Sequence, residues 1–97
     1  MQIIEVAGVN FKNIVHGMTN EHIEKQGYKL IEKMDLTNAI GQAATCFVVG
    51  FKSGDIEYER LMYFTGETKA IWINTNYPKE MKKLLLPALI ASLLTAQ

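Results

Sequence analysis

The stretch from Ala43 to Asn76 constrains the fold more than any other part of the chain. It contains three apolar runs, rich in β-branched and aromatic residues, which are typical of strands. Two short segments around Gly54 and Gly66 separate these runs and contain the residue types of tight turns. In chain order, the runs and turns are Ala43–Lys52, Ser53–Asp55, Ile56–Phe64, Thr65–Thr68 and Lys69–Asn76. The sequence therefore predicts a three-stranded antiparallel meander with positive φ at both glycines.

Pairing these strands through four-residue loops predicts which side chains share a face, because directly opposed residues project to the same side of a sheet. One predicted face is apolar except for an arginine, and we expect the last helix to pack on it. It contains Phe47, Val49, Phe51, Ile56, Tyr58, Arg60, Met62, Phe64, Ile71 and Ile73. The other face is mixed and contains Cys46, Val48, Glu57, Glu59, Leu61, Tyr63, Ala70, Trp72 and Asn74. Both faces carry large side chains, so we expect both to be covered; a slip of one residue in either loop would exchange the sets.

The segments before the meander predict further elements. Gln2–Ala7 and Tyr28–Leu36 alternate weakly between apolar and polar residues, which indicates one or two additional strands. Between them, Thr19 can cap a short helix that ends before Gly27, a residue suited to the left-handed conformation that ends helices.

The segment after the meander predicts a long helix. Pro78 fits its first position, where the missing N–H costs no hydrogen bond. Apolar residues from Met81 to Leu94 cover more than half of the helix circumference, so we expect burial on more than one side. The predicted fold class is α+β: one domain over residues 1–97, with an antiparallel sheet packed by a short N-terminal helix and a long C-terminal helix.

Charge and hydropathy exclude some partners. Ten basic residues balance ten acidic ones, so nothing predicts nucleic-acid binding, and weak repulsion between copies favours self-association. The apolar run Leu84–Leu94 is too short for a membrane span. The N-terminal residues lack the basic start and apolar core of a signal peptide. We therefore expect a cytoplasmic protein as written, or an envelope or periplasmic one if the native gene is longer.

No motif predicts an enzyme, a cofactor or a metal. The seven glycines are scattered singly, so no phosphate-binding loop is present, and Cys46 is expected to be a small buried hydrophobe. Glu57 and Glu59 share a predicted face and could act as paired carboxylates, which leaves a hydrolase as a weak alternative. A solvated strand edge is the simpler interpretation. We predict no catalytic, cofactor-binding or metal-binding residue.

Two groups of residues are candidate contact sites. Aromatic side chains are enriched at the energetic centres of interfaces, and one predicted face carries such a group. This candidate interaction surface consists of Leu61, Tyr63, Trp72 and Asn74. The alternative is a small-molecule pocket between the C-terminal helix and the apolar face, close to Tyr58 and Arg60.

The order of elements resembles the PsbP-like fold family, an α/β/α sandwich on an antiparallel sheet. The residues that carry the resemblance are Met18–Glu21 with Gly27, Tyr58–Phe64 before Gly66, Ile71–Thr75 before Tyr77-Pro78-Lys79-Glu80, and Ala91–Leu94. The family includes a photosystem II extrinsic subunit, a Ran-binding nuclear-transport factor and the bacterial envelope protein DcrB. Its larger members begin with extra strands and a helix that this chain lacks, which indicates a minimal or truncated version.

The resemblance implies a domain that docks onto other proteins and has no shared catalytic residue. Our leading hypothesis is therefore a non-enzymatic protein-interaction or assembly domain of a bacterial envelope protein, which binds another protein or a second copy of itself. The alternative is a small-molecule binding domain.

Overall fold

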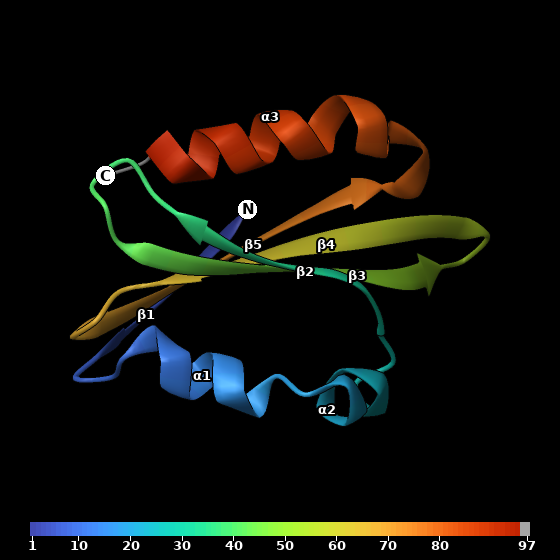
Figure 1. Ribbon diagram of the computed structural model, residues 1–97. Coiled ribbons are helices and arrows are strands. Elements are labelled where there is room, and N and C mark those ends of the chain that lie inside the picture. Colours follow the sequence, from blue (N-terminus) through green and yellow to red (C-terminus); the bar gives the residue numbers. More distant parts are fainter. Residues whose placement is uncertain (96–97) are drawn as a thin grey trace.

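Five strands form one antiparallel sheet in the computed structural model, which describes residues 1–95 (Figure 1). The strands are β1 (Gln2–Ala7), β2 (Lys29–Thr37), β3 (Ala43–Ser53), β4 (Ile56–Thr65) and β5 (Lys69–Pro78). Their order across the sheet is β1-β5-β4-β3-β2, and every neighbouring pair is antiparallel. The predicted α+β class and the meander with two further strands are confirmed.

Helices cover both faces of this sheet (Figure 1). One face is covered by α1 (Phe11–Gly17) and α2 (Asn20–Lys25), and the opposite face by a 3₁₀ turn, η1 (Lys79–Met81), followed by α3 (Lys82–Thr95). The predicted Thr19 cap is confirmed, since its hydroxyl accepts a hydrogen bond from the His22 N–H at 3.1 Å. The sequence predicted one N-terminal helix, whereas the structure has two; Phe11–Val15, a short segment of undetermined type in the sequence, forms most of α1. Pro78 was predicted to begin the last helix, whereas it ends β5.

Both predicted turn glycines have positive φ, 64° at Gly54 and 103° at Gly66. Gly54 and Asp55 are the two residues between the paired Ser53 and Ile56, and a glycine at the first central position suits such a hairpin. The backbone is packed more closely around Gly66: a Cβ added there would lie 2.0 Å from the carbonyl oxygen of Lys69. Glycine is therefore required at this turn by both conformation and space.

The strand register differs from the prediction at both hairpins. Predicted pairing opposes Phe51 to Ile56, whereas Phe51 is opposed to Tyr58, a shift of two residues that leaves the faces of β3 and β4 unchanged. Predicted pairing also opposes Phe64 to Lys69, whereas Phe64 is opposed to Trp72. This second shift is an odd number of residues, so it exchanges the two faces of β5.

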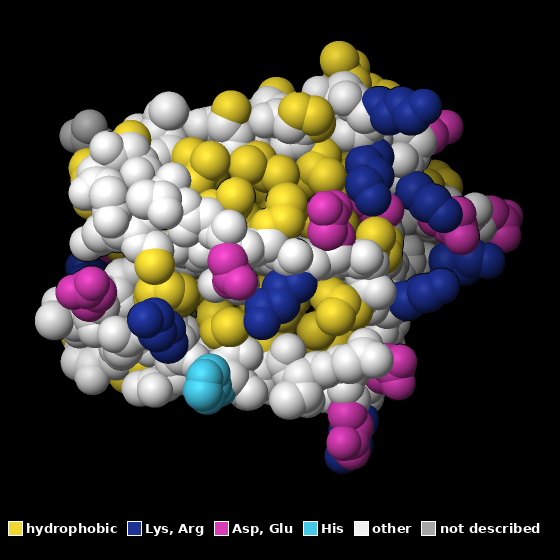
Figure 2. All heavy atoms as spheres, viewed as in Figure 1, with side chains coloured by type: hydrophobic (Ala, Val, Ile, Leu, Met, Phe, Trp, Pro, Cys, Tyr) yellow, Lys and Arg dark blue, Asp and Glu magenta, His cyan; other side chains and the backbone are white. Residues whose placement is uncertain are grey.

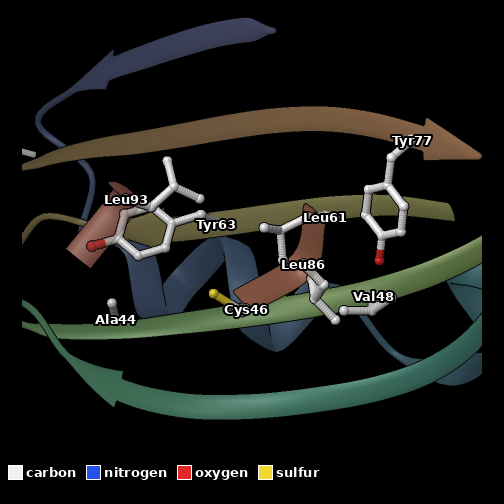
Figure 3. Close-up of a cluster of buried hydrophobic side chains, with 8 residues drawn as sticks. All are labelled: Ala44, Cys46, Val48, Leu61, Tyr63, Tyr77, Leu86 and Leu93. Carbon is white, nitrogen blue, oxygen red and sulfur yellow. The ribbon is translucent and has the colours of Figure 1, made fainter. Parts of the chain in front are cut away.

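Two apolar cores result, one on each face of the sheet. The core beneath α3 consists of Ala44, Cys46, Val48, Leu61, Tyr63, Tyr77, Leu86 and Leu93 (Figure 3). The core beneath α1 and α2 consists of Phe11, Ile23, Phe47, Val49, Met62, Phe64 and Ala70. The prediction that the last helix packs on the Phe47 face is therefore wrong. The two N-terminal helices cover that face, and the transfer of Ile73 to the opposite side helps to complete an apolar surface for α3.

Candidate interaction surfaces

The four residues of the predicted interaction surface do not form one surface. Leu61 and Tyr63 are 0% and 3% exposed and belong to the core beneath α3. Trp72 and Asn74 lie on the opposite face, where Trp72 is directly opposed to Phe64 and Asn74 to Met62. The grouping is wrong because of the odd register shift between β4 and β5.

Trp72 is half-buried beside the first strand and is held by polar contacts. Its ring centroid lies 5.1 Å from that of Phe64, and its indole N–H donates to the Asn74 Oδ1 at 2.6 Å. The Asn74 amide donates in turn to the Gln2 Oε1 at 3.3 Å. A cavity of about 210 Å³ beside α2 is lined by Trp72, Asn74 and Arg60.

Arg60, which lies on the face of the sheet that α1 and α2 cover, is stabilised by aromatic rings. Its guanidinium carbon lies 5.2 Å from the centroid of Tyr28 and 5.7 Å from that of Phe51. Phe51 stacks on Tyr58 at 5.6 Å, and the Arg60 Nε donates to the Asn76 Oδ1 at 2.8 Å. Cation–π contacts and a hydrogen bond thus satisfy the charge without a ligand.

The predicted pocket beside Tyr58 and Arg60 is divided between two cavities. Tyr58 lines a cavity of about 880 Å³ at the end of the sheet, between the β3–β4 hairpin, the start of β2 and the start of α3. Arg60 lines only the smaller cavity beside α2. Both basic and acidic side chains line the larger cavity: five lysines (Lys29, Lys52, Lys79, Lys82 and Lys83) and three glutamates (Glu57, Glu59 and Glu80). Figure 2 shows the charged side chains that gather at this end of the molecule, on the right of the view.

Glu59 is buried, contrary to the solvated strand edge that the sequence predicted. It is 1% exposed, and its Oε1 accepts a hydrogen bond from the Tyr77 hydroxyl at 2.8 Å and lies 3.6 Å from the Lys82 Nζ. Burial, with the adjacent Glu59 carboxylate, raises the pKa of the Tyr77 hydroxyl. Glu57 is half-exposed and pairs with Lys79 at 3.6 Å. The two carboxylates therefore have separate partners, and Glu59 fixes the beginning of α3.

Cys46 is a buried small hydrophobe, as predicted. It is 0% exposed beneath α3, and burial raises the pKa of its thiol to about 11. Nucleophilic cysteines have lowered pKa values and some exposure, so this thiol is structural. Among residues 1–95, no three His, Cys, Asp or Glu side chains come together in a group that could hold a metal ion.

The outward face of α3 carries exposed apolar side chains that the sequence pattern did not single out as a site. Leu84 is 69% exposed and Met81 38% exposed, and Ala88 and Ala91 are also exposed. Leu84, Ala88, Ala91 and Thr95 follow the spacing of one helix face, opposite the buried Leu86 and Leu93. In Figure 2 hydrophobic side chains reach the surface at the top of the view, over α3. The sequence did contain an indication of this surface, because the apolar residues of the helix extend beyond the one face that packs on the sheet.

Both ends of α3 are tied to the sheet layer. Lys82 in its first turn pairs with Glu59 of β4, and the Leu94 carbonyl in its last turn accepts a hydrogen bond from the Ala39 N–H at 2.7 Å. The helix is 14 residues long, and no helix of the described part of the chain has the length and apolarity needed to span a bilayer. No protein-family model, curated protein or solved structure shows significant similarity to this chain.

Proposed function

We propose that this chain is a non-enzymatic protein-interaction domain whose contact surface is the outward face of α3. The observation that carries the proposal is the exposure of Leu84, at 69%, on a helix whose apolar residues cover more than half of its circumference. Surface helices of globular proteins normally present charged residues to water, and a helix that is apolar on all sides is normally buried on all sides. After Lys83, no charged residue occurs in α3.

The partner that fits this surface is a protein with an apolar groove. Recognition of a helix by a groove uses side chains at successive turns of one face, and here Leu84, Ala88 and Ala91 occupy such positions. The two alanines allow close approach, and Leu84 supplies the large side chain that fills a pocket. Because Glu59 and Ala39 hold the two ends of α3, the surface is presented in a fixed orientation, which reduces the entropy lost on binding.

This proposal agrees with the docking role that the resemblance to the PsbP-like family implies, and we extend it to a place in the bacterial envelope. It replaces the earlier candidate surface, because Leu61 and Tyr63 lie beneath α3 and cannot reach a partner without displacing it.

Site-specific photocrosslinking tests the proposal. A photoreactive amino acid replaces Leu84 or Ala88 on α3, and His16, an exposed residue of α1, provides the matched control on the opposite layer. We expect one discrete adduct from the two α3 positions and none from His16. The adduct partner, once purified, should bind the chain directly, and Leu84→Lys should weaken that binding by about tenfold or more, as for a buried anchor residue. Equal crosslinking at His16, or an adduct of twice the mass of the chain, would contradict the proposed partner.

A second candidate function is small-molecule binding in the cavity at the end of the sheet. The observation that favours it is the combination of stacked Phe51 and Tyr58 rings with five lysines around about 880 Å³. Two of these lysines pair with glutamates of the same lining, Lys79 with Glu57 and Lys82 with Glu59. A planar anion would therefore bind to the other three, Lys29, Lys52 and Lys83. Thermal stabilisation by aromatic carboxylates that disappears in a Lys52→Ala variant would support this function, and no stabilisation by any of them would exclude it.

A further inference from the structure

The two edges of the sheet differ in how well they resist pairing with another strand. Edge strands are commonly protected by charged residues and β-bulges. The outer strand β2 has both: its register shifts between Leu30 and Glu32, and Lys29, Lys33 and Asp35 add further charges. The opposite edge, β1, has no register irregularity and no proline, and five of its six residues are exposed.

The backbone of β1 offers a row of free hydrogen-bonding groups. The Gly8 N–H donates to the Thr68 carbonyl at 2.8 Å and continues the ladder in which Val6 opposes Ala70. Hydrogen-bonded pairs alternate in antiparallel sheets, so Gln2, Ile4 and Val6 bond to β5. The N–H and C=O groups of Ile3, Glu5 and Ala7 consequently point away from the sheet.

We propose that β1 pairs antiparallel with β1 of a second copy of this chain, with Ile4 on the twofold axis. Several registers would join the outward groups of Ile3, Glu5 and Ala7 in the two strands. The register centred on Glu5 places like charges directly opposite each other, which is destabilising. The register centred on Ile4 places Glu5 opposite Ile3, and the one centred on Val6 places it opposite Ala7, so both remove this repulsion. We choose the register centred on Ile4, because it brings together the two Ile4 side chains, each of which is opposed to Trp72 in its own sheet.

This register also continues the side-chain rows of each sheet across the interface. On the face of α1 and α2, Trp72 of β5 opposes Ile4, so the row becomes Trp72, Ile4, Ile4 and Trp72 across the two copies. Ile3, which is 60% exposed, gains the apolar stem of Glu5 as its neighbour. Glu5, the one charged residue of β1, has an ion-pair partner within its own sheet, because its Oε2 lies 2.9 Å from the Lys69 Nζ.

A second copy fits this edge better than an unrelated strand. Antiparallel pairing of two identical strands has a twofold axis, and in the register centred on Ile4 each Glu5 meets an Ile3, so no charge meets its like. The chain has no net charge, so two copies approach without long-range repulsion. The edge is remote from the outward face of α3, so the dimer and the proposed partner of α3 are independent of each other.

Two substitutions of Glu5, by proline and by alanine, test pairing at the edge of the sheet without removing a hydrogen bond to β5. The Glu5 N–H points outward, so Glu5→Pro removes an edge donor without removing a bond to β5. Glu5→Ala keeps the donor and removes the same carboxylate, and is the matched control. In sedimentation equilibrium of the full chain we expect a dimer for wild type and Glu5→Ala, and weakening by about 10-fold to 100-fold for Glu5→Pro. A monomeric wild type, or a dimer unaffected by Glu5→Pro, would overturn the proposal.

A disulfide test checks the register and remains decisive if Glu5→Pro fails to fold. Opposed residues of a pair without hydrogen bonds have Cα atoms about 4.5 Å apart, within disulfide range. Ile4→Cys should therefore form a covalent dimer under mild oxidation, while Glu5→Cys should not. Cys46 is fully buried and cannot compete. A covalent dimer from Glu5→Cys alone, or from neither variant, would refute the register with Ile4 on the axis.

Discussion

Replacing single leucines of α3 by alanine should give two very different losses of stability. Leu93 is 5% exposed beneath the helix, next to Tyr63 in the core (Figure 3), whereas Leu84 is 69% exposed on the outward face. Full burial of a leucine contributes about 1.5–3 kcal/mol, and truncation within a packed core costs about 2–5 kcal/mol because a cavity remains. Leu84, with less than a third of its surface buried, should cost only about 0.5–1 kcal/mol.

Urea denaturation measures this contrast directly. The free energy of unfolding is obtained for wild type, Leu93→Ala and Leu84→Ala, at a protein concentration low enough to keep the chain monomeric. Both changes replace leucine by alanine in the same helix, so helix propensity and the compactness of the unfolded chain affect them similarly. Equal losses for the two variants would mean that α3 is rotated about its axis relative to the sheet. The proposal that the outward face of α3 is a docking surface would then be wrong.

Two further predictions concern a turn and the pH dependence of stability. Gly66→Ala should destabilise the chain by at least about 2 kcal/mol in urea denaturation, because φ is 103° and the new Cβ would lie 2.0 Å from the Lys69 carbonyl oxygen. Gly17→Ala is the matched control and should be neutral or slightly stabilising, since no atom lies within 4 Å of its Cβ position; comparable destabilisation by both would contradict the turn geometry. Burial raises the pKa of the Cys46 thiol from 9.0 to about 11, so the unfolded chain loses this proton at a lower pH than the folded chain does. The Cys46 thiol should therefore lower the free energy of unfolding between pH 9 and pH 11, by at most about 1.4 kcal/mol per pH unit. Urea midpoints between pH 8 and pH 11 should show a shallower decline for Cys46→Ala, and an unchanged decline would contradict this assignment.

The secondary structure could be predicted where single residues determine the backbone. Gly54 and Gly66 have the positive φ that the sequence analysis expected, and the three meander strands end within two residues of their predicted limits. Thr19 caps α2 as predicted. Local conformational preferences account for each of these features, and they do not depend on what packs nearby.

The pairing of β4 with β5 could not be predicted in the same way. Either face of β5 contains enough apolar side chains to be buried: Ile71 and Ile73 on one, Ala70 and Trp72 on the other. Hydrophobic pattern therefore does not determine the register, and loop length determines it instead. The assumed four-residue loop opposed Phe64 to Lys69, and this assumption misplaced Trp72 and Asn74 and assigned Ile71 and Ile73 to the face that α1 and α2 cover.

Buried polar groups were missed for a related reason. In its strand, Glu59 lies close to the charged residues Glu57 and Arg60, and a segment with several charged residues indicates exposed side chains. It is buried because Tyr77 and Lys82, 18 and 23 positions further along, provide a hydrogen bond and a positive charge. Buried carboxylates require partners of this kind, and partners this distant in sequence are found only after the strands have been paired.

Helix α3 contains more apolar residues than its packing against the sheet requires. Sequence alone predicted that this helix is buried on more than one side, and the fold accounts for only one: Leu86 and Leu93 face the sheet, while Leu84, Ala88 and Ala91 face water. An apolar outward face contributes nothing to the stability of this chain by itself, and it increases the risk of aggregation. A mixed-charge surface would avoid that risk without changing the core. The contact outside the chain that we propose would account for the uncharged outward face, and the proposed pairing of β1 rests on the same kind of argument, since the other edge of the sheet carries a bulge and more charges.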